Sequence, residues 1–247
     1  MLFRNWSIRL TSAKPYCESR NSLAATLSYY GHCAFLWEGE SGSRLLIDPF
    51  GNSEEKLWFP EPFPHLDADV VAVTHDHFDH NHFHRVPNCP TVLRGEGKFI
   101  LNDFTIEGAT DIHSGRSGLL GMKNTVFTID VGGVRYCHIG DNRHDMPDAV
   151  ARTIGECDVL LITVDDSKHL LSYEQVDELI ARLAPRVVMP MHYYIPKLTS
   201  VESTLKSAEG WLETQNNVRY LGVDSLTLGP ADIPISRQVW VMTHASR

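Results

Sequence analysis

The stretch between Val70 and His80 constrains this chain more than any other part of it. Its first four residues, VVAV, are apolar and mostly β-branched, which predicts a short buried strand. Three histidines and two aspartates follow within six positions, at His75, Asp76, His77, Asp79 and His80. Because each buried imidazole would otherwise need its own hydrogen-bond partner, one shared metal ion satisfies the group better than ordinary packing does. Zinc and similar divalent ions prefer imidazole and carboxylate ligands, so we expect a metal-binding loop where this strand ends.

The motif resembles the signature of the metallo-β-lactamase superfamily, which in this chain reads His75-x-His77-x-Asp79-His80. That signature also requires an earlier acid and three later residues, and the chain supplies them in order as Asp48, His113, Asp141 and His192. The Asp-Pro, Gly-Asp and Met-Pro-Met-His sequences at these positions are most similar to the branch that contains ascorbate phosphate lactonase. The resemblance extends over about residues 24 to 229.

The resemblance implies an α/β fold, a four-layer αββα sandwich with its metal loops along one edge. It also implies two divalent ions, the first bound by His75, His77 and His113, the second by Asp79, His80 and His192. Asp141 is expected to lie between the two ions, and Asp48 to hold a ligand or its loop in place. Zinc is the preferred ion because it binds such ligands more tightly than manganese or ferrous iron, and manganese is the alternative.

Such a centre implies hydrolysis. Two divalent ions hold a bridging water, lower its pKa towards neutrality and polarise the carbonyl or phosphoryl group that it attacks. Asp79 is expected, in addition, to orient that water or to carry its proton. The candidates for binding substrate are Arg116 in a glycine-rich segment, Arg143 close to Asp141, and Tyr193 or Tyr194 as a donor to the developing oxyanion.

Two further segments each have two interpretations. His32 follows Gly31 in a predicted turn, where it either lines the site or, as we prefer, serves as a structural hydrogen-bonding residue. The segment from Pro49 to Pro64 is rich in proline and aromatic residues. It forms either an apolar wall for the substrate or a packed connection.

Periodicity predicts three helices. The first covers about residues 148–156. The second follows the capping box that begins at Ser172 and carries an apolar stripe up to Leu183. The third covers about residues 201–214. Strands are expected over residues 24–30, 33–37 and 44–48, and in a hairpin closed by Gly132 and Gly133.

Length and charge restrict the organisation and the partners. The chain has 247 residues, and we expect one hydrolase domain over residues 24–247. The net charge of −9, without a block of Lys and Arg, disfavours long nucleic acid as a substrate. No apolar run approaches the ~20 residues of a membrane span. The five widely spaced cysteines contain no Cys-x-x-Cys pair and suggest a reducing cytoplasm.

Residues 1–23 precede the resemblance to the superfamily. They carry Arg4, Arg9, Lys14 and Arg20, with no acid before Glu18. An added arm or edge strand is the preferred interpretation, because apolar and polar residues alternate from Trp6 to Leu10. An organellar transit peptide over residues 1–20 is the alternative.

Three functions compete at this point. The first is a dinuclear metal-dependent hydrolase that acts on a small anionic ester or lactone. The second is a phosphodiesterase that acts on a small nucleotide or lipid head group. The third is a metal-binding sensor or scaffold without catalysis, which the complete set of candidate ligands disfavours. The oligomeric state does not follow from the sequence.

Overall fold

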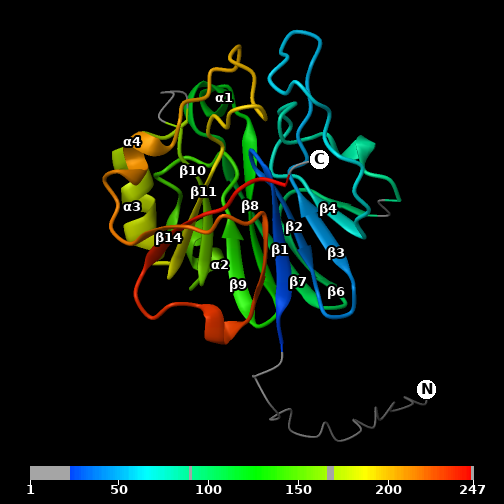
Figure 1. Cartoon of the computed structure of the whole chain (residues 1–247), viewed down its shortest axis with the longest axis vertical. Helices are drawn as coiled ribbons and strands as arrows, with labels where there is room; N and C mark the ends of the chain where they lie inside the picture. Colours follow the sequence, from blue (N-terminus) through cyan, green and yellow to red (C-terminus); the bar gives the residue numbers. More distant parts are fainter. Residues whose placement is uncertain (1–22, 89–90, 166–169, 246–247) are drawn as a thin grey trace, which may run out of the picture.

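Two β-sheets pack face to face and share one hydrophobic core (Figure 1). The computed structural model describes residues 23–88, 91–165 and 170–245. The first sheet has six strands in the order β13-β1-β2-β3-β4-β5. Their bounds are β1 Ala25–Gly31, β2 Ala34–Glu38, β3 Arg44–Ile47, β4 Val70–Ala72, β5 Thr91–Leu93 and β13 Ser225–Leu228.

The second sheet has eight strands in the order β12-β14-β11-β10-β9-β8-β7-β6. Their bounds are β6 Gly97–Leu101, β7 Phe104–Ile112, β8 Lys123–Val131, β9 Val134–His138, β10 Val159–Thr163, β11 Val187–Met191, β12 Val218–Tyr220 and β14 Gln238–Val241. Strands β9, β10 and β11 run parallel, as do β3, β4 and β5. The loops that follow the strands of such a set leave the sheet at the same edge.

The residue pattern explains which strands are covered on both faces. Every residue of β10 and of β11 is buried, as expected for parallel strands with a sheet on one face and helices on the other. Strand β1 alternates between buried and half-buried residues instead. Its half-buried Thr26 and Ser28 pair with Thr227 and Ser225 of β13 through hydroxyl contacts of 3.0 Å.

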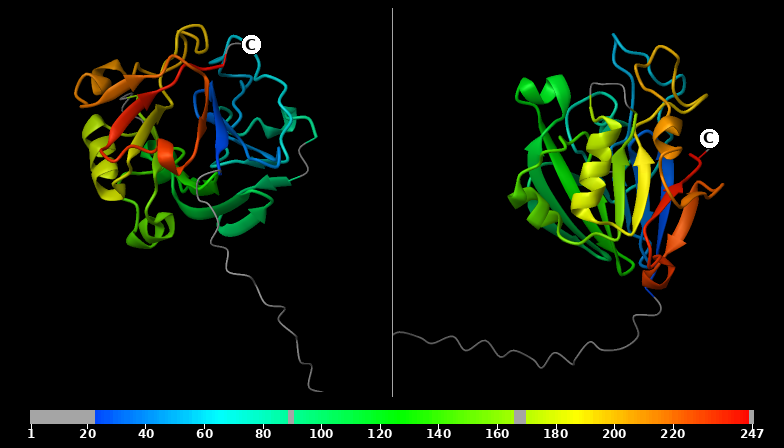
Figure 2. Two further views of the ribbon diagram at one scale, coloured as in Figure 1. Left: turned by 60° about the horizontal axis from the view of Figure 1, so that its bottom comes forward. Right: turned by 90° about the vertical axis from the view of Figure 1, so that its left-hand side faces the viewer.

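Helices cover the outer face of the eight-stranded sheet (Figure 2). These are α2 Asp148–Ile154, α3 Tyr173–Leu183 and α4 Glu209–Leu212. Helix α3 begins with the predicted capping box between Ser172 and Gln175 and buries its apolar stripe. Another helix, α1 Gly115–Leu119, lies in the segment that was expected to be a glycine-rich loop. The remaining helical turns are η1 Phe83–Arg85 and η2 Pro230–Asp232.

The outer face of the six-stranded sheet is covered by an irregular segment. Phe50, Phe59 and Phe63 are buried against alternate residues of β2, β3 and β4. The rings of Phe50 and Phe59 stack with centroids 4.1 Å apart. The predicted α/β sandwich is therefore confirmed, with the difference that packed aromatic rings replace α-helices in one outer layer.

The helix expected over residues 201–214 can be compared with the structure, whereas almost all of the arm expected over residues 1–23 cannot. The helix expected over residues 201–214 is wrong in extent, because only α4 forms there. Leu205 instead turns into the aromatic layer, and the Tyr194 amide donates to the Lys206 carbonyl. The predicted arm over residues 1–23 lies outside the described residues except for Leu23. Within the described ranges, none of the helices has the length and apolar character needed to cross a bilayer.

Candidate metal centre

The centre is built where two neighbouring parallel strands end. Strand β3 is followed by Asp48, and strand β4 is followed by Val73 and Thr74. The Thr74 amide and hydroxyl donate to the two carboxylate oxygens of Asp48 at 2.8 and 2.7 Å. These contacts fix the start of the loop that carries His75, His77, Asp79 and His80.

Asp48 also orients one of the candidate ligands. Its Oδ2 lies 2.8 Å from Nδ1 of His80, and both side chains are fully buried. A hydrogen bond from Nδ1 leaves Nε2 of His80 as the nitrogen that faces the centre. Burial raises the pKa of Asp48 to about 6, although the hydrogen bonds from Thr74 oppose this rise. Asp48 thus makes the kind of contact that the sequence led us to expect of it.

Four predicted residues form the first group of potential ligands. Atoms of His75, His77, His113 and Asp141 all lie within 4.8 Å of one another. Oδ2 of Asp141 is 3.7 Å from Nε2 of His75 and 3.4 Å from Nε2 of His113. Nδ1 of His113 contacts the Ser114 carbonyl at 2.6 Å, which leaves its Nε2 free of a proton when the ring is neutral.

The other predicted ligands, Asp79, His80 and His192, form a second group next to the first. Nε2 of His80 is 3.6 Å from Oδ2 of Asp141, and Nε2 of His192 is 3.4 Å from the same oxygen. Oδ2 of Asp79 is 3.8 Å from Nε2 of His80 and 3.7 Å from Nε2 of His192. One oxygen of Asp141 therefore contacts both groups, although Asp141 lies far from the loop motif in sequence.

The donors fit divalent ions. Two ligands of one tetrahedral ion, each about 2.0–2.2 Å from it, lie roughly 3.3–3.6 Å apart. The contacts of 3.4 to 3.8 Å between the buried carboxylates and imidazoles are close to this separation. Within the described part of the chain, these buried atoms of the candidate ligands lack a hydrogen-bond partner: His80 Nε2, His113 Nε2 and Asp141 Oδ1. Such atoms suit metal ligands better than a packed core.

Electrostatics favour a ligand-ready protonation state at His75 and at Asp141, whereas nearby carboxylates raise the pKa of His113 and of His192 despite their burial. Burial lowers the pKa of His75 well below its ordinary value, so this imidazole is neutral. Burial by itself would raise the pKa of Asp141, but His192 and His80 outweigh it and hold that pKa well below the ordinary value. The carboxylate is therefore ionised, and neutral imidazole with ionised carboxylate is the form that binds metal.

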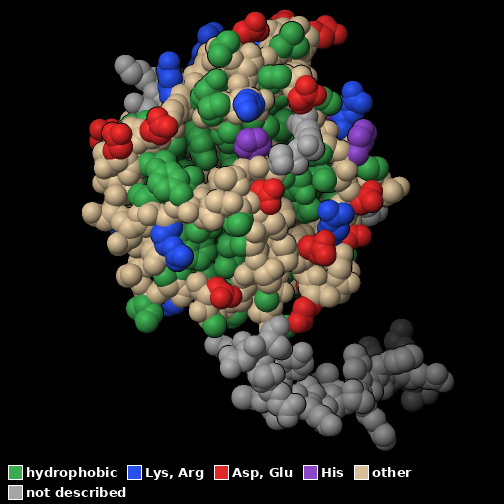
Figure 3. Space-filling view, in the orientation of Figure 1, with side chains coloured by type: hydrophobic (Ala, Val, Ile, Leu, Met, Phe, Trp, Pro, Cys, Tyr) green, Lys and Arg blue, Asp and Glu red, His purple; other side chains and the backbone are tan. Residues whose placement is uncertain are grey.

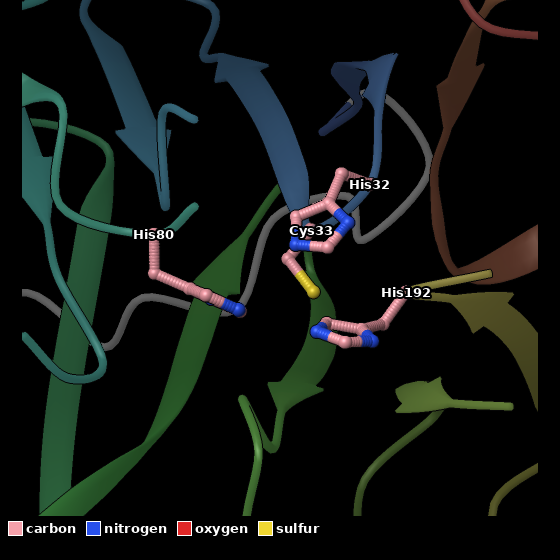
Figure 4. Close-up of side chains that lie close together, drawn as sticks. All are labelled: His32, Cys33, His80 and His192. Carbon is pink, nitrogen blue, oxygen red and sulfur yellow. The ribbon is translucent and has the colours of Figure 1, made fainter. Parts of the chain in front are cut away.

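Three further residues at the second group were not assigned to it from the sequence. Nε2 of His32 lies 3.1 Å from Oδ2 of Asp79, and its ring centroid is 4.3 Å from that of His192. Figure 4 shows His32 and Cys33 beside His80 and His192, and potential ligand atoms of these four lie within 4.8 Å of one another. Cys33 is a buried free thiol, as expected for a small apolar residue.

Asp165 is the third of these residues. Its Oδ2 lies 3.7 Å from Nδ1 of His192, and both side chains are buried. One signal could have found it, because Asp165 follows β10, the parallel neighbour of β11, which delivers His192. Residues after adjacent parallel strands meet at the same edge of a sheet.

One of the four candidate substrate-binding residues lies at the centre. Arg116 lines a cavity of about 440 Å³ together with His77, His113, Asp141 and His192. Segments from four parts of the chain complete this metal cavity, contributing Lys56, Trp58, Phe78, Asp79, Ser117, Glu202 and Thr204.

The other three candidates point elsewhere. The guanidinium of Arg143 binds the buried carboxylate of Asp111, with N···O distances of 2.9 to 3.2 Å. Tyr193 and Tyr194 line a different, mostly apolar cavity, which Met242 also lines. His192, which precedes the two tyrosines, has a left-handed backbone with φ of 58°. None of these three side chains lines the metal cavity.

Comparison with known proteins agrees with this geometry. The sequence profile of a family described as the beta-lactamase superfamily domain matches residues 26–192, including every candidate ligand. The chain belongs to the metallo-β-lactamase superfamily. This match confirms the predicted superfamily and fold; the lactonase branch stays a prediction.

Relatives within the superfamily indicate the class of enzyme. A UPF0173 metal-dependent hydrolase of Methanosarcina mazei is 28% identical over 202 residues, which cover 68% of this chain and 82% of that protein. A metal-dependent hydrolase of Methanosphaera stadtmanae is 27% identical over 203 residues, covering 68% of this chain and 83% of its own. The predicted enzyme class, a metal-dependent hydrolase of this superfamily, is confirmed at this level.

Solved structures also resemble the chain. A Thermotoga maritima protein, described as a candidate zinc-dependent hydrolase of the superfamily, is 29% identical, with a TM-score of 0.69. The match covers 88% of this chain and 98% of that protein. A Veillonella parvula protein with a TM-score of 0.60 is only 10% identical, and this likeness shows the fold alone.

Proposed function

We propose that this chain is a dinuclear metal-dependent hydrolase of a small anionic ester or lactone. One observation carries the proposal. Oδ2 of Asp141 lies 3.4 to 3.7 Å from the Nε2 atoms of four buried histidines, His75, His80, His113 and His192. A single carboxylate oxygen between two sets of imidazoles suits a residue that touches two ions.

The candidate ligands would bind two metal ions. His75, His77 and His113 would hold one ion, and Asp79, His80 and His192 the other, with Asp141 shared. When bound, two divalent ions polarise the carbonyl or phosphoryl group and lower the pKa of a water between them. Asp79, which lines the cavity, would in addition orient that water or carry its proton as the catalytic residue.

The metal cavity suits a small anion. Lys56 and Arg116 line it from two separate segments, and either side chain can bind a carboxylate or a phosphate. A long nucleic acid is disfavoured by the net charge of −9. The described cysteines Cys33, Cys137 and Cys157 are free, which suits the cytoplasm that we propose as the compartment.

Zinc is the ion that we propose first. It binds nitrogen and oxygen ligands more tightly than manganese does, and the Thermotoga maritima protein is described as zinc-dependent. Manganese is the alternative. The cations of the cavity also suit a phosphodiester, so hydrolysis of a small phosphodiester is the second candidate function.

Initial rates of hydrolysis separate these functions. The substrates are γ-butyrolactone, monomethyl succinate and bis(para-nitrophenyl) phosphate, each with protein loaded with zinc or with manganese. Chelator-treated protein is the blank. We expect metal-dependent turnover of the ester or lactone to exceed that of the diester. Faster diester turnover would move the assignment to a phosphodiesterase, and a loaded protein that turns over none of the three would support a sensor or scaffold.

A further inference from the structure

The segments that line the metal cavity also carry exposed apolar side chains. Leu57 is 60% exposed, Leu119 90%, Leu120 78% and Val201 86%. We refer to these four residues as the apolar rim. Single exposed apolar residues are ordinary on a protein surface, but a group of them around one cavity is not.

Each rim residue lies close in sequence to residues that line the metal cavity. Leu57 stands between Lys56 and Trp58, and both of these line it. Leu119 and Leu120 follow Arg116 and Ser117 in and after helix α1. Val201 precedes Glu202, which lines the third side.

The three segments gather at one end of the molecule. Helix α1, the segment after β3 and the segment after β11 all lie at the top of Figure 1, and the right-hand view of Figure 2 agrees. Figure 3 shows hydrophobic side chains among charged ones at this end of the surface. The four rim residues therefore belong to segments at the same end of the molecule as the metal cavity.

Two aromatic side chains, Trp58 and Phe78, line the metal cavity itself. The rings of Trp58 and Phe78 pack edge to face, with centroids 5.3 Å apart. Nζ of Lys56 lies 5.6 Å from the centroid of the Trp58 ring and 5.4 Å from that of Phe78. A positive charge thus sits against two aromatic rings, and all three side chains line the metal cavity.

We propose that the substrate is an anionic amphiphile. Its carboxylate or phosphate binds Lys56 and Arg116, its ester or lactone bond lies at the metal centre, and its alkyl or aryl chain lies across the apolar rim. Water adds to the acyl carbon, the acyl–oxygen bond breaks, and the products are a carboxylate, an alcohol and a proton. This inference rests on the proposed function, since it names the substrate class of that same site.

Two other occupants of the rim fit less well. A second copy docked on the rim would close the mouth of the cavity and bring the same acidic segment, with Glu54 and Glu55, towards its own copy. An anionic membrane surface would be repelled by these exposed acids and by Glu202. A monomeric amphiphile leaves the cavity open, and its single anionic group can bind Lys56 and Arg116, which line the cavity.

Monoalkyl succinates test the proposal, because they keep one anionic group while the alkyl chain changes. With metal-loaded full-length protein, we expect kcat/KM for monooctyl succinate to exceed that for monomethyl succinate by about tenfold. All concentrations stay below the micellar range. Equal kcat/KM for the two monoesters contradicts this inference alone, whereas hydrolysis of neither contradicts the proposed function.

Substitutions of exposed residues show which part of the surface causes the preference for the octyl ester, and they leave the hydrophobic core intact. Leu119→Ser is expected to lower kcat/KM for the octyl ester about fivefold and to leave the methyl ester unchanged. The matched control is Ile235→Ser, an isoleucine that is 99% exposed and follows η2 at the opposite end of the molecule. An equal loss in both variants overturns the assignment of the chain to the rim.

Two binding measurements exclude the other occupants. Sedimentation velocity of wild-type protein and Leu119→Ser should give the same oligomeric state, and a change from dimer to monomer would make the rim an interface between copies. Flotation with phosphatidylcholine vesicles should leave the protein unbound. Binding to these vesicles that Leu119→Ser abolishes would make the rim a membrane contact and overturn the proposal.

Discussion

Nε2 of His32 lies 3.1 Å from Oδ2 of Asp79, and both side chains are buried. Contacts with two other segments hold His32 in place. The ring of His32 packs edge-on against Phe59, with centroids 5.4 Å apart, while its carbonyl accepts a hydrogen bond from the His192 amide at 3.0 Å. His32 thus connects two candidate ligands that are far apart in sequence, and it orients the Asp79 carboxylate.

A variant of His32 is expected to weaken the second metal site. Asparagine tolerates the left-handed backbone of this residue, whose φ is 54°, but it is too short to reach Asp79. We expect His32→Asn to lower metal affinity or kcat about 10–100-fold, with KM little changed. Competition with a coloured chelator measures the affinity. His65→Ala, at an exposed histidine, is the control, and unchanged affinity in His32→Asn would remove the orienting role.

Removal of a candidate ligand should abolish turnover without unfolding the chain. His77 lines the metal cavity, so His77→Ala takes away a ligand and leaves the hydrophobic core intact. We expect loss of metal-dependent hydrolysis, with an unchanged circular dichroism spectrum. His84→Ala serves as the control, because this exposed histidine lies outside the ligand pattern. Full activity of His77→Ala would refute the assignment of this ligand.

Arg116 should act on anionic substrates. Its side chain lines the metal cavity, so Arg116→Ala should raise KM for an anionic ester about tenfold and leave KM for a neutral lactone almost unchanged. Steady-state kinetics with monomethyl succinate and γ-butyrolactone measure the two values. Arg152→Ala, at an exposed arginine of α2, is the matched control. An equal rise for both substrates would argue against a contact with the anionic group.

Arg143 should contribute to stability instead of substrate binding. Asp111 raises the pKa of the Arg143 guanidinium through a hydrogen bond, and the Asp111 side chain is buried. Arg143→Ala leaves that carboxylate without this partner, so we expect the free energy of unfolding to fall by about 1–3 kcal/mol. Urea denaturation measures the change. A large rise of KM for an anionic ester at unchanged stability would restore the role expected from the sequence.

The sequence predicted the local part of the centre well, because a buried strand and a run of ligands are adjacent in the chain. Residues 70–80 contain the buried strand β4 followed by the loop that carries His75, His77, Asp79 and His80. His113, Asp141 and His192 were expected only through the family resemblance, and the structure brings them to this loop. The aromatic outer layer was left open between a wall and a packed connection, and it is packed, although Trp58 also lines the cavity.

Long-range geometry was beyond prediction from sequence. The contact between His32 and Asp79 depends on where two turns meet, and no local pattern encodes that. Tyr193 or Tyr194 was expected to donate to the oxyanion, but both line a cavity other than the metal cavity. Likewise, a helix was expected over residues 201–214, whereas Val201 is exposed and Leu205 is buried outside any helix. Tertiary contacts of this kind override local propensity.

The number of metal ions bound per chain tests whether the centre is dinuclear and shares Asp141. Metal-free protein is titrated with zinc, and the bound ion is counted by plasma emission spectroscopy after gel filtration, for wild-type chain and for Asp141→Asn. We predict that the wild-type chain binds two zinc ions. In Asp141→Asn, the affinity for both ions should fall, because Oδ2 of Asp141 contacts both groups of ligands. One tightly bound ion per chain, or two ions held equally well without the Asp141 carboxylate, would contradict a dinuclear centre that shares this residue.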